Sequence, residues 1–181
     1  MVTFLQIFLS NIVLIMVLIT IHEIGHWFMG RVAGIPTKSM KIQLLMFPQQ
    51  VMLRDGEQWK SVATDFDSYN ATLMTFLPSR SGRIMYVVGG FLFESCFIVI
   101  LTFLLARTGF WLFALVAPGA SLMMYLIYLF VMDLPQVRKS QHPWGDTSIL
   151  YSIAPSVAII VAVGMVLVRI VLCVAVALKV L

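Results

Sequence analysis

Charged side chains are scarce in this sequence. Asp, Glu, Lys and Arg together make up 11% of its 181 residues, whereas soluble domains carry about 25%. Hydrophobic residues make up 61%, against roughly 45–50% in soluble proteins. This composition excludes an ordinary soluble domain. It also excludes a disordered or fibrous chain, because both need far more polar or repetitive sequence. The sequence is typical of a protein that crosses the membrane several times.

Cysteine is also scarce, and no basic stripe is present. Cys96 and Cys173 both lie within apolar runs, which argues against a disulfide framework. The net charge is +4, but the basic residues are scattered beside apolar runs instead of being gathered as in a nucleic-acid-binding surface. We therefore expect the lipid bilayer as a partner and no nucleic acid.

Four apolar runs are long enough to span the membrane. A transmembrane helix needs about 20 predominantly apolar residues. The runs cover residues 2–28, 84–106, 110–132 and 149–178. We therefore expect one domain over residues 1–181, an all-α polytopic membrane protein with four transmembrane helices. No segment is long enough for an added PDZ-like or nucleotide-binding domain.

The first connection, over about residues 37–80, has the signature of a membrane-associated β-hairpin. Runs of strand-forming residues flank the Asp-Gly dipeptide at 55–56, and Asp-Gly in this position is typical of a type I′ turn. The apolar residues 44–47, together with Trp59, indicate that the hairpin lies against the membrane interface. Residues 65–81 are expected to be polar interfacial chain.

Basic residues are unevenly distributed between the two sides of the expected bundle. With four spans, the first and third connections share one side, and they carry most of the basic residues: Arg31, Lys38, Lys41, Arg54, Lys60, Arg80, Arg83, Arg138 and Lys139. The other side offers Arg107 and Lys179. Because basic residues favour the cytoplasm, we expect a multi-pass cell-membrane protein with both termini outside and the hairpin connection in the cytoplasm.

An H-E-x-x-H motif, His22-Glu23-Ile24-Gly25-His26, stands near the end of the first run. Residues four apart on a helix share a face, so both imidazoles can bind one zinc ion. Glu23 flanks that face, where a carboxylate can act as the general base toward a metal-activated water. Ionisable residues in a membrane helix cost free energy unless polar partners satisfy them, and such residues are usually functional. The motif therefore favours a zinc site over a polar cluster that reaches interfacial water.

A catalytic zinc usually has three protein ligands and one open position, so one ligand is still to be found. The candidates are His142, Asp146, Asp133 and Glu94. Asp146 precedes the fourth run, and its carboxylate suits a zinc ligand and a helix N-cap equally well. His142, beside a proline, is more typical of a loop histidine. Glu94 lies within an apolar run, so it is expected either to be protonated or to pair with Arg169.

These motifs resemble the site-2 protease family of intramembrane zinc metalloproteases, over nearly the whole chain. His22, Glu23 and His26 match the family's H-E-x-x-H helix, and the segment Gly145-Asp146-Thr147 resembles its later Leu-Asp-Gly or Ser-Asp-Gly signature. The resemblance implies that Asp146 is the third zinc ligand, that each chain holds one zinc ion and that Glu23 is the catalytic residue. A membrane-associated β-hairpin after the motif helix is also a family trait.

Two further stretches carry the resemblance, with departures. Gly89-Gly90, followed by Glu94, resembles the family's Ala-Gly-Pro-x-x-Asn stretch, and Asp133 begins a segment like its Asn-x-x-Pro stretch. In the family those asparagines help to orient the active site or the substrate backbone. The resemblance therefore implies substrate-binding roles for all four residues, although the glycines also suit close helix contacts. Glu94 and Asp133 stand where asparagines are expected, and Thr147 replaces a glycine.

Together these features predict a zinc-dependent endopeptidase that cleaves a transmembrane or hydrophobic peptide segment near the cytoplasmic face. Its partner would be a membrane-embedded protein or peptide, and residues 41–63 would hold an unwound substrate segment by strand addition. The altered asparagine and glycine positions motivate an alternative: a metal-binding, non-proteolytic membrane protein, such as a chaperone or immunity-type partner of a small hydrophobic peptide. Glu23 argues against that alternative, because a structural zinc needs no general base.

Overall fold

The structure is a computed structural model that describes residues 4–45, 49–140 and 142–181. It is mostly helical, and its long helices are α1 (Phe4–Ala33), α3 (Arg80–Arg107), α4 (Trp111–Ile127) and α7 (Pro155–Ala177). The shorter helices are α2 (Phe66–Phe76), α5 (Leu134–Ser140) and α6 (Asp146–Ile153). Three strands complete the fold: β1 (Met40–Gln43), β2 (Gln50–Asp55) and β3 (Gln58–Lys60).

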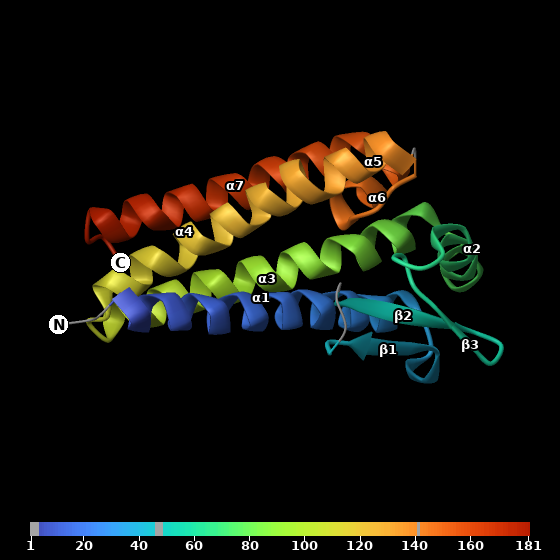
Figure 1. Cartoon of the computed structure of the whole chain (residues 1–181), viewed down its shortest axis with the longest axis horizontal. Helices are drawn as coiled ribbons and strands as arrows, with labels where there is room; N and C mark the ends of the chain where they lie inside the picture. The colour runs from blue at the N-terminus through green and yellow to red at the C-terminus, as the bar shows by residue number, and fades with distance from the viewer. Residues whose placement is uncertain (1–3, 46–48, 141) are drawn as a thin grey trace.

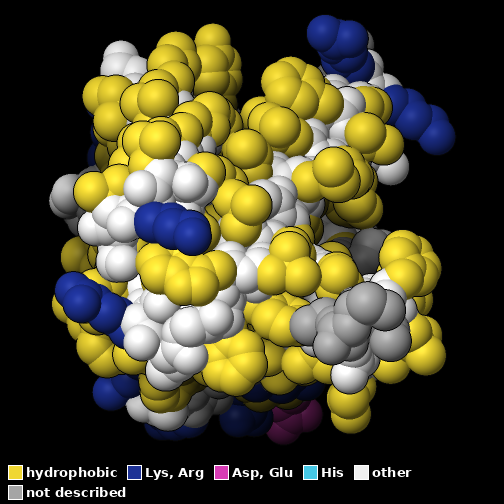
Figure 2. All heavy atoms as spheres, turned by 90° about the vertical axis from the view of Figure 1, so that its left-hand side faces the viewer, with side chains coloured by type: hydrophobic (Ala, Val, Ile, Leu, Met, Phe, Trp, Pro, Cys, Tyr) yellow, Lys and Arg dark blue, Asp and Glu magenta, His cyan; other side chains and the backbone are white. Residues whose placement is uncertain are grey.

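Among the described residues, four helical stretches are long and apolar enough to cross a membrane, which confirms the four expected helices. They are Phe4–Ala33, Arg80–Arg107, Trp111–Lys139 and Pro155–Ala177. Their outward faces are apolar: Phe4 is 83% exposed and Ile160 is 70% exposed. Figure 2 shows hydrophobic side chains over much of the surface at the end where the chain termini lie. Apolar surface of this extent is suited to contact with lipid.

The helices form a bundle, and the end that carries the sheet, α2 and α6 is called the polar end below. In Figure 1, α1 lies beside α3 and α4 lies beside α7, while the sheet, α2 and α6 gather at one end of the bundle. Both chain termini lie at the opposite end, as an even number of spans requires. The side of the membrane that each end faces stays a prediction from the distribution of basic residues.

The fourth apolar run, expected as one helix over residues 149–178, is in fact two helices. α6 ends at Ile153 and α7 begins at Pro155. Proline suits the first position of a helix and disfavours a helical conformation in the residue before it. Ala154 accordingly has φ −152° and ψ 83°. The break separates α6 from the long apolar helix α7, so the two helices can follow different directions.

The third run, expected over residues 110–132, also differs in its boundaries. After α4 the chain continues through a π-helical segment, Tyr128–Asp133, into α5. A π-helical segment has one more residue per turn than an α-helix and often lies at a functional site. Here it carries Asp133, which is fully buried.

The sheet has the strand order β1-β2-β3, and both pairs are antiparallel. The expected hairpin is β2 and β3, and β1 adds a third strand. The expected type I′ turn was wrong: Asp55 still pairs with Gln58, so the central residues are Gly56 and Glu57. Of these two only Gly56 has a positive φ, 59°, which fits the type II′ turn with glycine at its first central position. Residues 46 and 47 of the expected apolar run lie outside the described residues.

Residues 65–81, expected as polar interfacial chain, contain helix α2 instead. Asp65 caps this helix, because its carboxylate accepts hydrogen bonds from the Ser68 backbone N–H at 3.0 Å and from the Ser68 hydroxyl at 2.6 Å. These bonds lower the pKa of the exposed Asp65 carboxyl. Tyr69 and Leu73 on the buried face of α2 join the core that includes Val51 of β2. The Asp65 cap and the buried apolar positions were the signals of this helix.

α1 and α3 contact each other through their backbones at two glycines. A Cβ atom added to Gly89 would lie 2.6 Å from the carbonyl oxygen of Gly25, and one added to Gly25 would collide with the backbone of Gly89. Small residues allow membrane helices to approach this closely. The contact brings the H-E-x-x-H segment of α1 against α3.

We expect the substitution Gly89→Val to force α1 and α3 apart, since no space exists for its side chain. Overpacking of this kind costs about 1–3 kcal/mol, which a thermal unfolding experiment on detergent-solubilised protein would detect as a lower midpoint. Gly164→Val on α7 is the matched control, because a Cβ atom there meets nothing within 4 Å. Equal midpoints for the two variants would contradict this account of the helix contact.

Candidate metal centre

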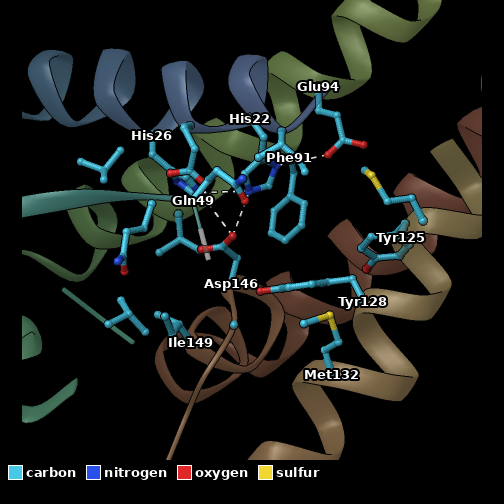
Figure 3. Close-up of a pocket in the computed structure, with 18 of the residues that line it drawn as sticks. His22, His26, Gln49, Phe91, Glu94, Tyr125, Tyr128, Met132, Asp146 and Ile149 are labelled. Atoms are coloured by element: carbon cyan, nitrogen blue, oxygen red, sulfur yellow. Dashed lines mark hydrogen bonds and ion pairs between the residues drawn. The ribbon is translucent and has the colours of Figure 1, made fainter. Parts of the chain in front are cut away.

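Three ligand-type atoms from two distant segments converge at the polar end of the bundle. His22 and His26 lie one turn apart on α1, and both imidazoles point toward Asp146 of α6 (Figure 3). Asp146 Oδ2 lies 2.9 Å from His22 Nε2 and 3.3 Å from His26 Nε2. The two Nε2 atoms are 3.1 Å apart. The three atoms therefore form a nearly equilateral triangle.

This triangle fits a tetrahedral zinc site. With metal–ligand distances of about 2.0–2.2 Å and tetrahedral angles, neighbouring ligand atoms lie about 3.3–3.6 Å apart. The observed separations of 2.9, 3.1 and 3.3 Å are slightly shorter than these. Two imidazoles and one carboxylate are a donor set that suits zinc, and three protein ligands are the number found in catalytic sites.

Asp146 is free to act as a ligand because other residues cap its helix. It is the first residue of α6, and Gly145 is the N-cap. Asp133 Oδ1 accepts a hydrogen bond from the Gly145 N–H at 3.1 Å, and Asp133 Oδ2 accepts one from the Ser148 N–H at 3.1 Å. The sequence left open whether Asp146 is a ligand or a helix cap. In the structure these roles fall to two residues: Asp133 binds the start of α6, and Asp146 faces the imidazoles.

The surroundings of Asp146 favour its charged form. Burial opposes ionisation, but the nearby His26 charge and the hydrogen bonds with His22 and His26 outweigh it. They hold the pKa of the Asp146 carboxyl below its usual value. The ionised carboxylate is the form that binds a metal.

Each imidazole also has a partner behind it. His26 Nδ1 donates to the backbone carbonyl of Tyr86 at 3.0 Å, and His22 Nδ1 lies 3.2 Å from Glu94 Oε2. A ring whose Nδ1 carries the proton leaves Nε2 with a free lone pair for a metal. Once Nε2 carries no proton, both rings can offer its lone pair to a single ion.

Gly90 of α3 makes room for the two imidazoles. A Cβ atom at this position would lie 2.6 Å from His26 Nε2 and 2.7 Å from His22 Nε2. Gly89, one residue earlier, contacts Gly25 and Met29 of α1. The structure thus gives both glycines packing contacts around the centre, whereas the resemblance implied that they bind substrate.

Glu23 lies beside the triangle. Its carboxylate can reach within 4.8 Å of the ligand nitrogens of His22 and His26, and it is contacted by the backbone N–H of Val51 on β2. Since Asp146 lies closer to both imidazoles than Glu23 does, it is the better candidate for the third ligand. No signal in the sequence points to Val51, because its contact is made by the backbone.

A cavity of about 570 Å³ opens at the centre, within the usual size range of ligand pockets. Its walls are mainly apolar, and Figure 3 shows several of the side chains: Phe91, Tyr125, Tyr128, Met132 and Ile149. The cavity is lined by Gln49 near the sheet and, farther along α1, by Ile15 and Asn11. It therefore continues from the polar end into the apolar part of the bundle.

Two of the other ligand candidates have different contacts. His142 is exposed, and its ring lies 6.3 Å from that of Phe66, so it takes no part in the triangle. Glu94 is paired with Arg169, which settles the choice that the sequence left open. The partner of His26, the Tyr86 carbonyl, is a backbone group for which the sequence carried no signal.

No protein-family model, curated protein or solved structure matches this chain. The similarity of its motifs to site-2 proteases therefore stays a prediction. The triangle, Glu23 and the cavity are the features that bear on function.

We expect Asp133→Ala to destabilise the protein and to weaken its binding of zinc. Without the carboxylate, the Ser148 N–H loses its acceptor and the Gly145 N–H keeps only the Ser148 hydroxyl. A buried N–H without an acceptor costs about 1–3 kcal/mol, and Asp146 loses its fixed position. Thermal unfolding and zinc content would both report the change. Asp67→Ala removes an exposed carboxylate on α2 and serves as the control. Unchanged zinc binding in Asp133→Ala would argue against its role in placing Asp146.

Proposed function

We propose that the protein is a zinc-dependent endopeptidase that cleaves a transmembrane or hydrophobic peptide segment within the membrane. The observation that carries this proposal is the convergence of His22, His26 and Asp146, with Glu23 beside them, in a cavity between apolar helices. A site built only to hold a structural metal would normally be closed by a fourth protein ligand. Here a buried carboxylate and a large cavity adjoin the three ligands.

The residues divide the chemistry between them. A zinc ion held by His22, His26 and Asp146 would supply a Lewis acid for the scissile carbonyl and lower the pKa of a water to about 7. Glu23 takes the proton of the attacking water and passes it to the leaving amine as the C–N bond breaks. The products are a new carboxylate and a new amine. The backbone N–H of Val51 contacts the Glu23 carboxylate and keeps it beside the reacting atoms.

The sheet offers a place for an unwound substrate. β3 pairs with Leu53–Asp55 only, so in the described part of the chain Gln50–Met52 has a strand neighbour on the β1 side alone. Gln50 and Val51 also line the cavity. An extended segment can add to such an edge by backbone hydrogen bonds. This narrows the expected substrate-holding region, residues 41–63, to the part of β2 nearest Glu23.

Substitution of Glu23 tests the proposal directly. The probe is a single-pass peptide of apolar residues, interrupted by Gly-Pro to ease unwinding, flanked by a fluorophore and a quencher and reconstituted with the protein in liposomes. We expect wild-type protein to hold about one zinc per chain and to cleave the probe. Glu23→Gln should keep the zinc and lose cleavage by about 10²–10⁴-fold, the usual contribution of general acid–base catalysis.

Glu57→Gln is the matched control, because Glu57 is an exposed carboxylate in the β2–β3 turn; it should cleave like the wild type. Cleavage by Glu23→Gln at the wild-type rate would contradict the proposed mechanism. Zinc in wild-type protein with no cleavage would instead favour the non-proteolytic metal-binding alternative. No zinc in wild-type protein would overturn both.

A further inference from the structure

A buried ion pair lies behind the metal centre, in the membrane-spanning part of the bundle. Glu94 of α3 is 4% exposed and Arg169 of α7 is fully buried, and Arg169 Nη2 donates to Glu94 Oε1. Charged groups within membrane helices are costly, and they usually mark a function. The catalytic scheme proposed above uses neither of these residues.

Side chains from two helices, α7 and α4, donate to one oxygen of Glu94. Besides Arg169, the hydroxyl of Ser121 on α4 donates to Glu94 Oε1 at 3.3 Å. Arg169 Nε in turn donates to Ser121 Oγ at 2.8 Å, and Arg169 Nη1 donates to the Met165 carbonyl at 2.9 Å. The charge and position of Glu94 are therefore fixed from the side that faces away from the metal centre.

The other oxygen of Glu94 faces a metal ligand. Oε2 lies 3.2 Å from His22 Nδ1, while Nε2 of the same ring lies 2.9 Å from Asp146. A continuous series of contacts thus runs from Arg169 through Glu94 and His22 to the ligand triangle. Figure 3 shows its part from Glu94 to Asp146. His26 differs from His22, because its Nδ1 meets the neutral carbonyl of Tyr86.

We propose that Glu94, neutralised by Arg169, is a positioning residue that makes His22 the stronger of the two imidazole ligands. Its carboxylate accepts the Nδ1 proton of His22, which fixes the ring orientation and raises the basicity of Nε2. Arg169 allows the Glu94 carboxylate to be buried in this apolar interior, because its positive charge balances the negative charge of the carboxylate. The inference rests on the proposed zinc site, but it concerns metal affinity and needs no proteolytic activity.

Paired substitutions separate a positioning role from a purely structural one. Zinc affinity would be measured by competition with a chromophoric chelator, and ligand geometry by the visible absorption of cobalt-loaded protein. Glu94→Gln should lower zinc affinity about 10–100-fold, as loss of such a partner usually does, and should lower the thermal midpoint because Arg169 loses its counter-charge. The double variant Glu94→Gln/Arg169→Gln should recover the midpoint but keep the low zinc affinity and the altered cobalt spectrum.

Ser95→Ala is the control, because the Ser95 hydroxyl lies 3.5 Å from Arg169 Nη1 and donates to Met165 Sδ at 3.1 Å, so its removal leaves the Glu94–His22 contact in place; the zinc affinity of this variant should equal that of the wild type. Wild-type zinc affinity and cobalt spectrum in a stable double variant would overturn the proposal and leave the pair as a structural link. If wild-type protein binds no zinc at all, the proposed function fails first, and this inference fails with it.

A second readout needs only folded wild-type protein and so survives poor folding of the variants. In zinc-loaded protein with ¹⁵N-labelled histidine, both Nδ1 atoms of the centre should carry protons. The proton on His22 should resonate farther downfield than that on His26, because a carboxylate is a stronger acceptor than a carbonyl. Equal proton shifts, or an Nδ1 without a proton in His22, would contradict the proposal.

Discussion

An ionisable side chain inside an apolar bundle needs a polar partner, because neither lipid nor hydrocarbon side chains can replace its lost hydration. In this protein that constraint joins four ionisable groups into one connected set. Arg169 binds Glu94, Glu94 contacts His22, and His22 contacts Asp146. These residues belong to α7, α3, α1 and α6. The same contacts that satisfy the buried charges therefore also hold four helices in register around the centre.

The helices depart from regular geometry next to the residues of this connected set. The break at Ala154 frees α6 from α7, so Asp146 can face α1 instead of continuing along the fourth span. The π-helical segment at Tyr128–Asp133 carries the carboxylate that binds the first turn of α6. At the α1–α3 contact, Gly89 lets the two backbones meet and Gly90 leaves space for the imidazoles. The positions of the ligand residues thus depend on irregular backbone and on glycines, which have no side chain.

The sequence was sufficient to predict features that depend on local pattern. It was insufficient for contacts that depend on how each helix is rotated about its axis. Long apolar runs identified the four helices that are apolar enough to cross a membrane, and the spacing of His22 and His26 placed them on one face. The partner of Glu94 stayed open, because a choice between protonation and Arg169 depends on which faces of α3 and α7 meet. Asp133 and Asp146 could not be told apart as cap and ligand, since both roles use carboxylate oxygens. Helix α2 was missed although Asp65 signalled it, and the turn at Gly56 was assigned one residue too early.

The charge balance explains why two carboxylates can stand where the resemblance leads one to expect asparagines. A zinc ion with Asp146 and an ionised Glu23 would be neutral overall, so a further carboxylate at position 94 would leave a net negative charge in the apolar interior. Arg169 removes that charge through its ion pair with Glu94. Asp133 needs no counter-ion of this kind, because both of its oxygens accept backbone N–H groups at the positive end of α6. In each case the carboxylate is an acceptor that an amide would replace only in part, since a carboxylate accepts at both oxygens and an asparagine at one.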